Sequence, residues 1–144
     1  MLHVKQLSIR FGTTKVVHKL DLSVECGQVR GLLGPNGAGK STLVKILTTI
    51  IRPTKCEGEM LGQPIGHKPT LQKVGYLPEH ARFPDYLTGR QVVEYSAGMA
   101  GISVRQASSR VDALLELVGM KDWAQRKVRT YSKGMKQRVG IAQA

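Results

Sequence analysis

The stretch GPNGAGKST, at residues 34–42, constrains the fold of this chain more than any other part of the sequence. Its glycines let the backbone turn through conformations that a Cβ atom forbids, so successive N–H groups can point at one anion. Apolar residues recur at helical spacing after the stretch and stop at Pro53, which predicts a helix. The first N–H groups of a helix have no partner within it and attract anions. We therefore predict a phosphate-binding loop that leads into a helix.

The same stretch fits the P-loop pattern, in which Gly34, Gly39, Lys40 and Ser41 occupy the four fixed positions. Lys40 carries a positive charge suited to β- and γ-phosphates, and the hydroxyl of Ser41 is a suitable ligand for Mg²⁺. The preceding apolar segment VRGLLG, residues 29–34, predicts a short buried strand that ends in the loop. The sequence therefore predicts a nucleoside triphosphate site. Its lining residues are expected to be Gly34, Pro35, Asn36, Gly37, Ala38, Gly39, Lys40, Ser41 and Thr42.

The length and hydrophobicity of the chain limit the classes of protein to which it can belong. The chain has 144 residues, of which 41% are hydrophobic, enough for one domain with a core. No run approaches the about 18 apolar residues needed to cross a bilayer, and the N-terminus alternates like a strand rather than a signal peptide. We therefore expect a cytoplasmic protein. Cys26 and Cys56 lack metal-binding spacing and are expected to be reduced thiols.

The first third of the sequence predicts strands. Apolar and polar residues alternate over residues 2–9 and again over 16–24, on either side of the turn residues GTT. The short stretches GEMLG, residues 58–62, and KVGYLP, residues 73–78, predict two further strands.

From Thr88 onward the pattern is that of helices. We expect Thr88 to cap a helix that ends near Met99, and Ser103 to cap a second one that ends at Val118. A last helix is expected to begin just after Ser132. Within the second helix an i, i+3, i+4, i+7 stripe indicates packing in the core of a helical subdomain. The stripe consists of Val111, Leu114, Leu115 and Val118.

Three segments together resemble the nucleotide-binding domain of ABC transporters: GPNGAGKST, VGYLPEHARFPDYLT and YSKGMKQRVGIAQA. They follow one another in the family's order, and the resemblance extends from about residue 2 to 144. It implies an α/β P-loop NTPase fold with an incomplete RecA-like core. An N-terminal antiparallel β-subdomain with the P-loop core is expected over residues 1–79, and an α-helical subdomain with the signature motif over 80–144.

The resemblance also implies roles for single residues, with ATP and Mg²⁺ as cofactors. Phe11 falls where the family stacks an aromatic ring on adenine, although it could instead pack within the β-subdomain. Glu79 falls at the Q-loop, where the family most often has glutamine. Ser41 falls where a hydroxyl binds Mg²⁺.

The segment YSKGM, residues 131–135, occupies the signature position usually written LSGGQ. In the family this serine acts in trans, because it faces the γ-phosphate held by the P-loop of a second domain. An ordinary capped helix with basic residues is the alternative. The signature residues implied here are Ser132, Lys133, Gly134 and Met135, of which Ser132 and Gly134 match the usual motif.

An apolar-aromatic loop follows the Q-loop position. In the family this region contacts the membrane subunit, so it predicts a docking surface, and packing between the two subdomains is an equal alternative. The loop comprises Arg82, Phe83, Pro84, Tyr86 and Leu87.

The family's Walker B aspartate and catalytic glutamate lie beyond the signature helix, and the sequence ends at Ala144 before them. We therefore expect no catalytic residue within these 144 residues and no efficient hydrolysis by them alone. The missing acidic groups also account for the net charge of +12, from 22 basic and 10 acidic residues. Aromatic residues make up 5% of the chain, too few for base stacking, so nucleic acid is not an expected partner.

The function that the resemblance implies is that of the ATP-binding subunit of an ABC transporter, with an exporter as the expected type. Its partners would be a transmembrane transporter subunit and a second ATP-binding domain, in a homo- or heterodimer. Such a subunit lies in the cytoplasm, peripheral at the inner face of the cell membrane. Two alternatives remain open: a non-hydrolysing ATP-binding module, and a soluble ABC ATPase that acts on ribosomes or DNA.

Overall fold

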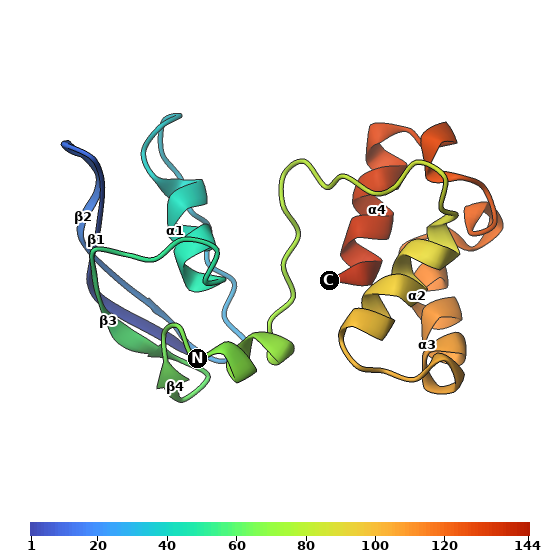
Figure 1. Ribbon diagram of the computed structural model, residues 1–144, viewed down its shortest axis with the longest axis horizontal. Coiled ribbons are helices and arrows are strands. Elements are labelled where there is room, and N and C mark those ends of the chain that lie inside the picture. The colour runs from blue at the N-terminus through green and yellow to red at the C-terminus, as the bar shows by residue number, and fades with distance from the viewer. The chain divides into compact units, whose positions relative to one another are not determined.

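A computed structural model describes residues 1–144, except for the side chain at position 104. The chain divides into two compact units, Met1–Val74 and Gly75–Ala144. The first unit contains an antiparallel sheet and the helix α1, and the second contains the helices α2, α3 and α4 (Figure 1). The expected α/β chain with an antiparallel β-subdomain and a helical subdomain is thus confirmed.

The sheet has the strand order β2-β1-β3-β4, and every neighbouring pair is antiparallel. The two predicted N-terminal strands form β1 (Leu2–Phe11) and β2 (Thr14–Val24), which are joined by a tight turn. β3 (Lys55–Met60) contains the first part of the predicted strand GEMLG, and β4 (Gln63–Pro64) follows it directly.

Three register shifts interrupt the pairing of β1 with β2, and side chains bond to the backbone at the first two. At the first, the amide of Gln6 donates to the Oδ1 of Asp21 at 2.7 Å; at the second, the amide of Lys19 donates to the Oγ of Ser8 at 2.9 Å. Gln6 and Lys19 both have positive φ angles, of 51° and 47°. Side chains thus satisfy the backbone groups that the bulges remove from the ladder.

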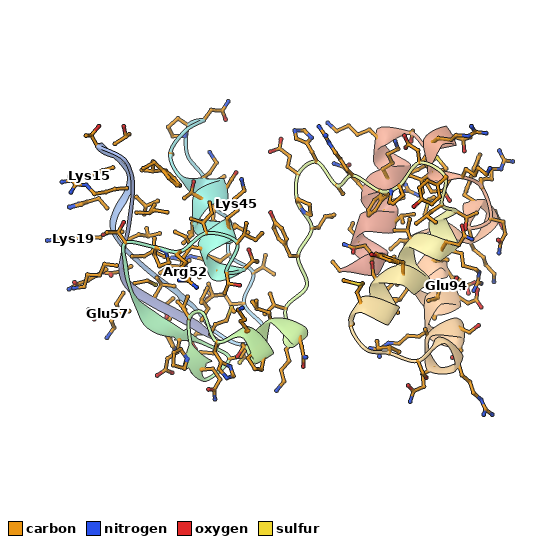
Figure 2. All side chains as sticks on the ribbon, viewed as in Figure 1. Lys15, Lys19, Lys45, Arg52, Glu57 and Glu94 are labelled. Carbon is orange, nitrogen blue, oxygen red and sulfur yellow. The ribbon has the colours of Figure 1, made fainter. Side chains whose placement is uncertain are left out.

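The core of the first unit lies between the sheet and α1 (Lys40–Leu47). Leu43 and Ile46, three residues apart on one face of α1, are buried in one cluster with three residues of β1. Each such burial stabilises the unit by about 1.5 to 3 kcal/mol. The β1 members of this cluster are Val4, Leu7 and Ile9. The outer surface of the unit carries charged side chains, such as Lys15, Lys19 and Lys45 (Figure 2).

Two predicted strands do not form. Residues 29–34 and 74–78 have no regular secondary structure, and Lys73 ends a 3-10 helix, Lys68–Lys73. The prediction failed because a strand needs a neighbour to take its hydrogen bonds, and no described segment pairs with either stretch. Val29 and Leu33 are accordingly 96% and 97% exposed rather than buried.

The three predicted helices of the second unit are confirmed as α2 (Gly89–Met99), α3 (Val104–Leu117) and α4 (Lys133–Gln143). The side chain of Ser103 makes no capping bond to the backbone of α3, because its hydroxyl donates to the side chain of Gln106 instead. The residue Thr88 caps α2 through a reciprocal pair of bonds. The amide of Gln91 donates to its hydroxyl at 3.2 Å, and its own amide donates to the side chain of Gln91 at 2.9 Å.

The core of the second unit joins all three helices to the connection between α3 and α4. Val111 and Leu115 of the predicted stripe are fully buried, and Leu114 and Val118 pack beside them, which confirms the predicted core face. No helix among the described residues is both long and apolar enough to cross a membrane. The buried residues of this core are Val92, Val93, Ala107, Val111, Leu115, Met120, Ala124, Val128, Tyr131, Val139 and Ala142.

Candidate functional site

The P-loop lies directly against β2. Gly39 has a φ of 87° and serves as the N-cap of α1, so its backbone is in the left-handed region that favours glycine. A Cβ at this position would lie 2.8 Å from the Cγ2 of Val17 and 3.1 Å from the carbonyl oxygen of Val16. Both the conformation and the contact therefore require glycine at the point where the loop enters the helix.

Lys40 closes the loop. Its Nζ donates hydrogen bonds to the carbonyl oxygens of Gly34 and Pro35, each at 2.7 Å. The carbonyl of Pro35 also accepts from the amide of Ala38 at 3.3 Å. An ammonium group has three donors, so one remains for a further acceptor. The lysine thus places a positive charge at the mouth of a loop that it also holds in shape.

The first turn of α1 offers further donors. The first hydrogen bond of the helical pattern runs from the amide of Leu43 to the carbonyl of Gly39 at 2.8 Å, so the amides of residues 40–42 have no acceptor within the helix. Gly39 has no side chain to cap them, and the first turn has no acidic residue. The positive end of the helix dipole is therefore left for an external anion.

This donor set fits a nucleotide with its magnesium ion. Amides and an ammonium group suit phosphate oxygens, and the exposed Ser41 provides a hydroxyl oxygen. Mg²⁺ usually keeps several waters and takes further ligands from phosphates, so it needs few protein ligands. Among the described residues no cluster of three or more histidine, cysteine or acidic side chains could form a metal site by itself.

Phe11 lies on the hairpin whose second strand contacts the P-loop. It is the last residue of β1, it pairs with Thr14, and β2 runs from there to Val17, which contacts Gly39. Its side chain is 50% exposed and does not belong to the buried cluster of its unit. An aromatic side chain is thus accessible on the hairpin that contacts the P-loop.

The signature segment lies in the second unit and opens α4. The Oγ of Ser132 accepts a hydrogen bond from the amide of Met135 at 3.3 Å, which confirms the predicted N-cap. Lys133 and Gly134 are exposed, whereas Met135 is half-buried against the core. The serine hydroxyl thus stands at an exposed helix N-terminus that has no acidic residue in its first turn.

The Q-loop position and the signature segment line one cavity of about 410 Å³ in the second unit. Glu79 and His80 lie on one side of it, and Tyr131, Lys133 and Lys136 lie on the other. Sequence reasoning missed His80 and Lys136 as members of this group. The spacing of Lys133 and Lys136 could have revealed the latter, because residues i and i+3 share a helix face.

The predicted docking loop divides into a buried and an exposed part. Phe83 and Leu87 pack against the core of their own unit, whereas Tyr86 is 73% exposed. Arg82 and Pro84 are exposed as well. A docking surface on this loop would therefore be centred on Tyr86.

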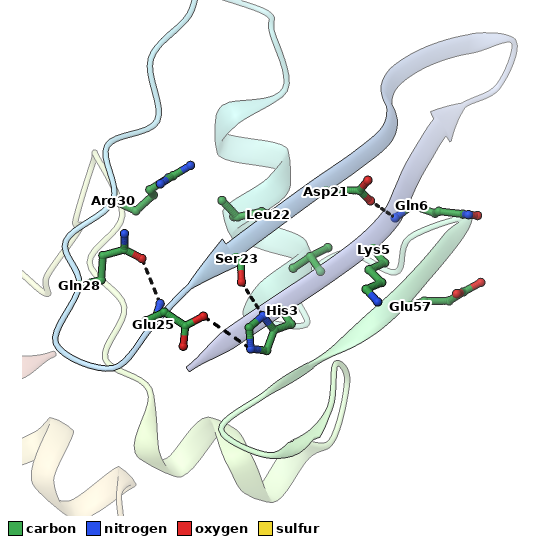
Figure 3. A pocket seen from close by; sticks show the side chains of 11 residues that line it. His3, Lys5, Gln6, Asp21, Leu22, Ser23, Glu25, Gln28, Arg30 and Glu57 are labelled. Atoms are coloured by element: carbon green, nitrogen blue, oxygen red, sulfur yellow. Dashed lines mark hydrogen bonds and ion pairs between the residues drawn. The ribbon is translucent and has the colours of Figure 1, made fainter.

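A hollow of about 610 Å³ on the first unit contains none of the predicted site residues (Figure 3). The Oγ of Ser23 and the Nδ1 of His3 lie 2.5 Å apart in it, and the Nε2 of the same ring lies 3.9 Å from Glu25. These side chains are exposed and lie on the solvent side of the hairpin. The arrangement is a surface network that bears no relation to the P-loop.

The fold and the P-loop define this chain as a fragment of a P-loop NTPase. A profile of the ABC transporter family matches residues 17–144. The chain therefore belongs to the ABC transporter family.

Individual relatives agree with the family match. An uncharacterized ABC transporter ATP-binding protein of Synechocystis sp. is 47% identical over 127 residues, which cover 87% of this chain and 36% of the relative. A daunorubicin resistance ATP-binding protein of Streptomyces coeruleorubidus is 38% identical over 135 residues, or 92% of this chain and 43% of the relative. The chain thus spans less than half the length of these curated relatives.

A solved structure supports the same fold. It is described as the structure of the ATP binding subunit of an ABC transporter, and it superposes with a TM-score of 0.86 at 28% sequence identity. The match covers 100% of this chain and 61% of that chain.

Proposed function

We propose that this chain is the ATP-binding part of an ABC transporter subunit that couples ATP binding and hydrolysis to transport. The observation that carries the proposal is the closed P-loop, in which the ammonium of Lys40 bridges the carbonyls of Gly34 and Pro35 at 2.7 Å. This geometry holds one positive charge beside the unpaired amides of residues 40–42. Such a cluster of donors suits the β- and γ-phosphates of ATP.

Four of the predicted site residues have stated roles in this proposal. Lys40 binds the β- and γ-phosphates, Ser41 binds Mg²⁺, and Phe11 stacks on the adenine. Ser132 contacts the γ-phosphate of ATP bound by a second copy or a related domain, in a homo- or heterodimer. The exposed ring of Phe11 and the exposed N-cap of Ser132 support these roles.

The partner in the membrane is a transmembrane transporter subunit, and the protein works at the inner face of the cell membrane. Tyr86 is the residue on which this contact would be centred, since it is the most exposed apolar side chain of its loop. The direction of transport is export. This choice rests on the relative named for daunorubicin resistance.

The test is Mg-ATP binding by the full-length protein, measured by isothermal titration calorimetry. We expect Lys40→Ala to weaken binding at least tenfold, because it removes the charge and opens the loop. Lys45→Ala is the matched control, since Lys45 is an exposed lysine in the last turn of the same helix (Figure 2). Equal affinities of Lys40→Ala and the wild type would contradict the proposal.

A second measurement distinguishes the transporter from its alternatives. Lysate of the source cells is separated into membrane, ribosome and soluble fractions, and the protein is located by immunoblotting. We expect it in the membrane fraction, and the purified complex should hydrolyse ATP in a Lys40-dependent manner. Recovery with ribosomes would favour the ribosomal alternative, and binding without any turnover would favour a regulatory module.

A further inference from the structure

Gly89, the first residue of α2, is buried and lies against the ring of Tyr131. Its φ is not in the left-handed region, so its backbone does not require glycine. A Cβ at position 89 would instead collide with the hydroxyl oxygen of Tyr131, and it would lie 3.2 Å from two of its ring carbons. The glycine is thus explained by the space that the tyrosine occupies.

A hydrogen bond also fixes the hydroxyl of Tyr131. It donates a hydrogen bond to the carbonyl oxygen of Trp123 at 2.6 Å, and the side chain is only 6% exposed. The guanidinium of Arg126 lies 4.3 Å from the centre of the Trp123 ring, and the amide of Gly89 donates to the carbonyl of Arg126 at 3.3 Å. The tyrosine is therefore held between the start of α2 and the turn at residues 121–126.

Burial raises the pKa of the Tyr131 phenol above its ordinary value of 10.0, against smaller opposing effects of the Gly89 backbone and the charge of Arg126. The group is therefore protonated at neutral pH and acts as a donor to Trp123. A leucine, the residue usual at this place in the signature motif, has no such donor.

Ser132 follows this anchored residue directly. Tyr131 is fixed by two hydrogen bonds, because its hydroxyl donates to Trp123 and its amide also donates to the carbonyl of Val128 at 3.0 Å. The Oγ of Ser132 accepts from Met135, and its own proton has no acceptor among the residues that the structure describes. The hydroxyl is thus held in place on one side and can donate on the other.

We propose that Tyr131 is a positioning residue, which orients Ser132 for the phosphate of a nucleotide bound by a second ATP-binding domain. The hydrogen bond to Trp123 and the close contact of the ring with Gly89 hold Tyr131 in the position that this role requires. This inference rests on the proposed function, and it adds Tyr131 and Gly89 as two residues whose effects on dimerisation are coupled. Tyr131 would affect association of two domains around ATP, and it would leave binding of ATP at the P-loop unchanged.

The experiment uses the full-length protein and the slowly hydrolysed analogue ATPγS with Mg²⁺. Binding to the P-loop is measured by calorimetry, and nucleotide-driven dimerisation by sedimentation velocity. We expect Tyr131→Phe to leave nucleotide affinity within twofold of the wild type and to weaken dimerisation about fivefold, the effect of one lost hydrogen bond. The matched control is Tyr95→Phe, because Tyr95 is 64% exposed on α2 and should change neither quantity.

A second pair of variants tests the contact with Gly89. Gly89→Ala should weaken dimerisation as Tyr131→Phe does, because the added methyl displaces the ring. Adding Tyr131→Leu to Gly89→Ala should make room for the methyl, so the double variant should lose less than the sum of the two single losses. The melting temperature of each variant is measured in parallel.

The outcomes separate this inference from the proposed function. If Tyr131→Phe dimerises as strongly as the wild type, with or without a lower melting temperature, the positioning role is overturned and the proposed function stays intact. Strictly additive losses in the double variant would overturn the coupling of Tyr131 with Gly89. A wild-type protein that neither binds nor dimerises with the nucleotide would overturn the proposed function as well.

Discussion

The Nζ of Lys40 lies 2.7 Å from the carbonyl oxygen of Gly34, at the opposite end of the P-loop. The loop is therefore closed by its own lysine. Two of the three donors of the ammonium group point at the loop and one remains, so a phosphate can bind without prior opening of the loop. Preorganisation of this kind lowers the entropy that binding would otherwise cost.

Removal of the Lys40 ammonium should loosen the ligand-free loop. In amide hydrogen exchange, we expect Lys40→Ala to speed exchange of residues 36–39 without nucleotide, because two hydrogen bonds that close the loop are lost. Lys45→Ala should exchange like the wild type. Unchanged exchange in Lys40→Ala would show that the loop keeps its shape by other contacts.

A methyl group at position 39 should damage the site, and one at position 31 should not. Gly39→Ala combines a left-handed φ of 87° with a contact of 2.8 Å to Val17, so we expect about 1 to 3 kcal/mol lower unfolding free energy and at least tenfold weaker ATP binding. Gly31→Ala is the control, since nothing lies within 4 Å of the added atom. Chemical denaturation and calorimetry measure the two quantities, and equal behaviour of both variants would contradict the geometry.

The two cysteines should react at different rates. Burial, with a smaller effect of the charge of Glu57, raises the pKa of the Cys56 thiol above 9.0, whereas Cys26 is exposed. Less thiolate and less access both slow alkylation of Cys56 near pH 8. We expect iodoacetamide to label Cys26 first, as followed by peptide mass spectrometry, and Cys26→Ser to leave only the slow reaction. Equal labelling rates would contradict the burial of Cys56.

Alkaline pH should destabilise the second unit through Tyr131. Because its pKa is raised in the folded state, the folded protein holds the phenolic proton more tightly than the unfolded chain does. This contribution to stability is complete below pH 10 and is lost as pH rises through the folded pKa. We expect the unfolding free energy of the wild type to fall more steeply above pH 10 than that of Tyr131→Phe. Parallel curves from urea denaturation would refute this expectation.

The exposed ring of Tyr86 offers a test of membrane docking. We expect Tyr86→Ala to lower the fraction of the protein that sediments with membranes containing its transporter partner, since an exposed aromatic side chain is a frequent anchor of interfaces. Tyr95→Ala, also in the second unit and 64% exposed, should keep the wild-type fraction. Equal fractions for both variants would place the contact elsewhere.

Local signals explain which elements were predictable. The helix after Thr88 could be predicted because its cap and its partner Gln91 lie within one turn, and the cap at Ser132 is equally local. The strand predicted at residues 29–34 does not form, because pairing depends on residues remote in sequence, and hydrophobicity alone does not provide a neighbour.

In the candidate site, too, local features were predictable and contacts between remote residues were not. The P-loop was predictable since its residues are consecutive, and the bond from Lys40 to Gly34 spans only the loop itself. His80 and Lys136 were missed as members of one group because the Q-loop position and the signature segment are remote in sequence and line one cavity only in the folded unit. The hydroxyl of Tyr131 was missed for a related reason, as its acceptor is a backbone carbonyl that sequence cannot show.

The contact between Gly89 and Tyr131 restricts the order in which these two positions can change during evolution. A lineage that first replaces Gly89 with alanine must pass through a protein whose tyrosine is displaced. A lineage that first replaces Tyr131 with leucine vacates the space, and a later side chain at position 89 can then fill it. Lineages that diverged from a protein with this pair should therefore have lost the tyrosine before the glycine, and intermediates with alanine beside tyrosine should be absent.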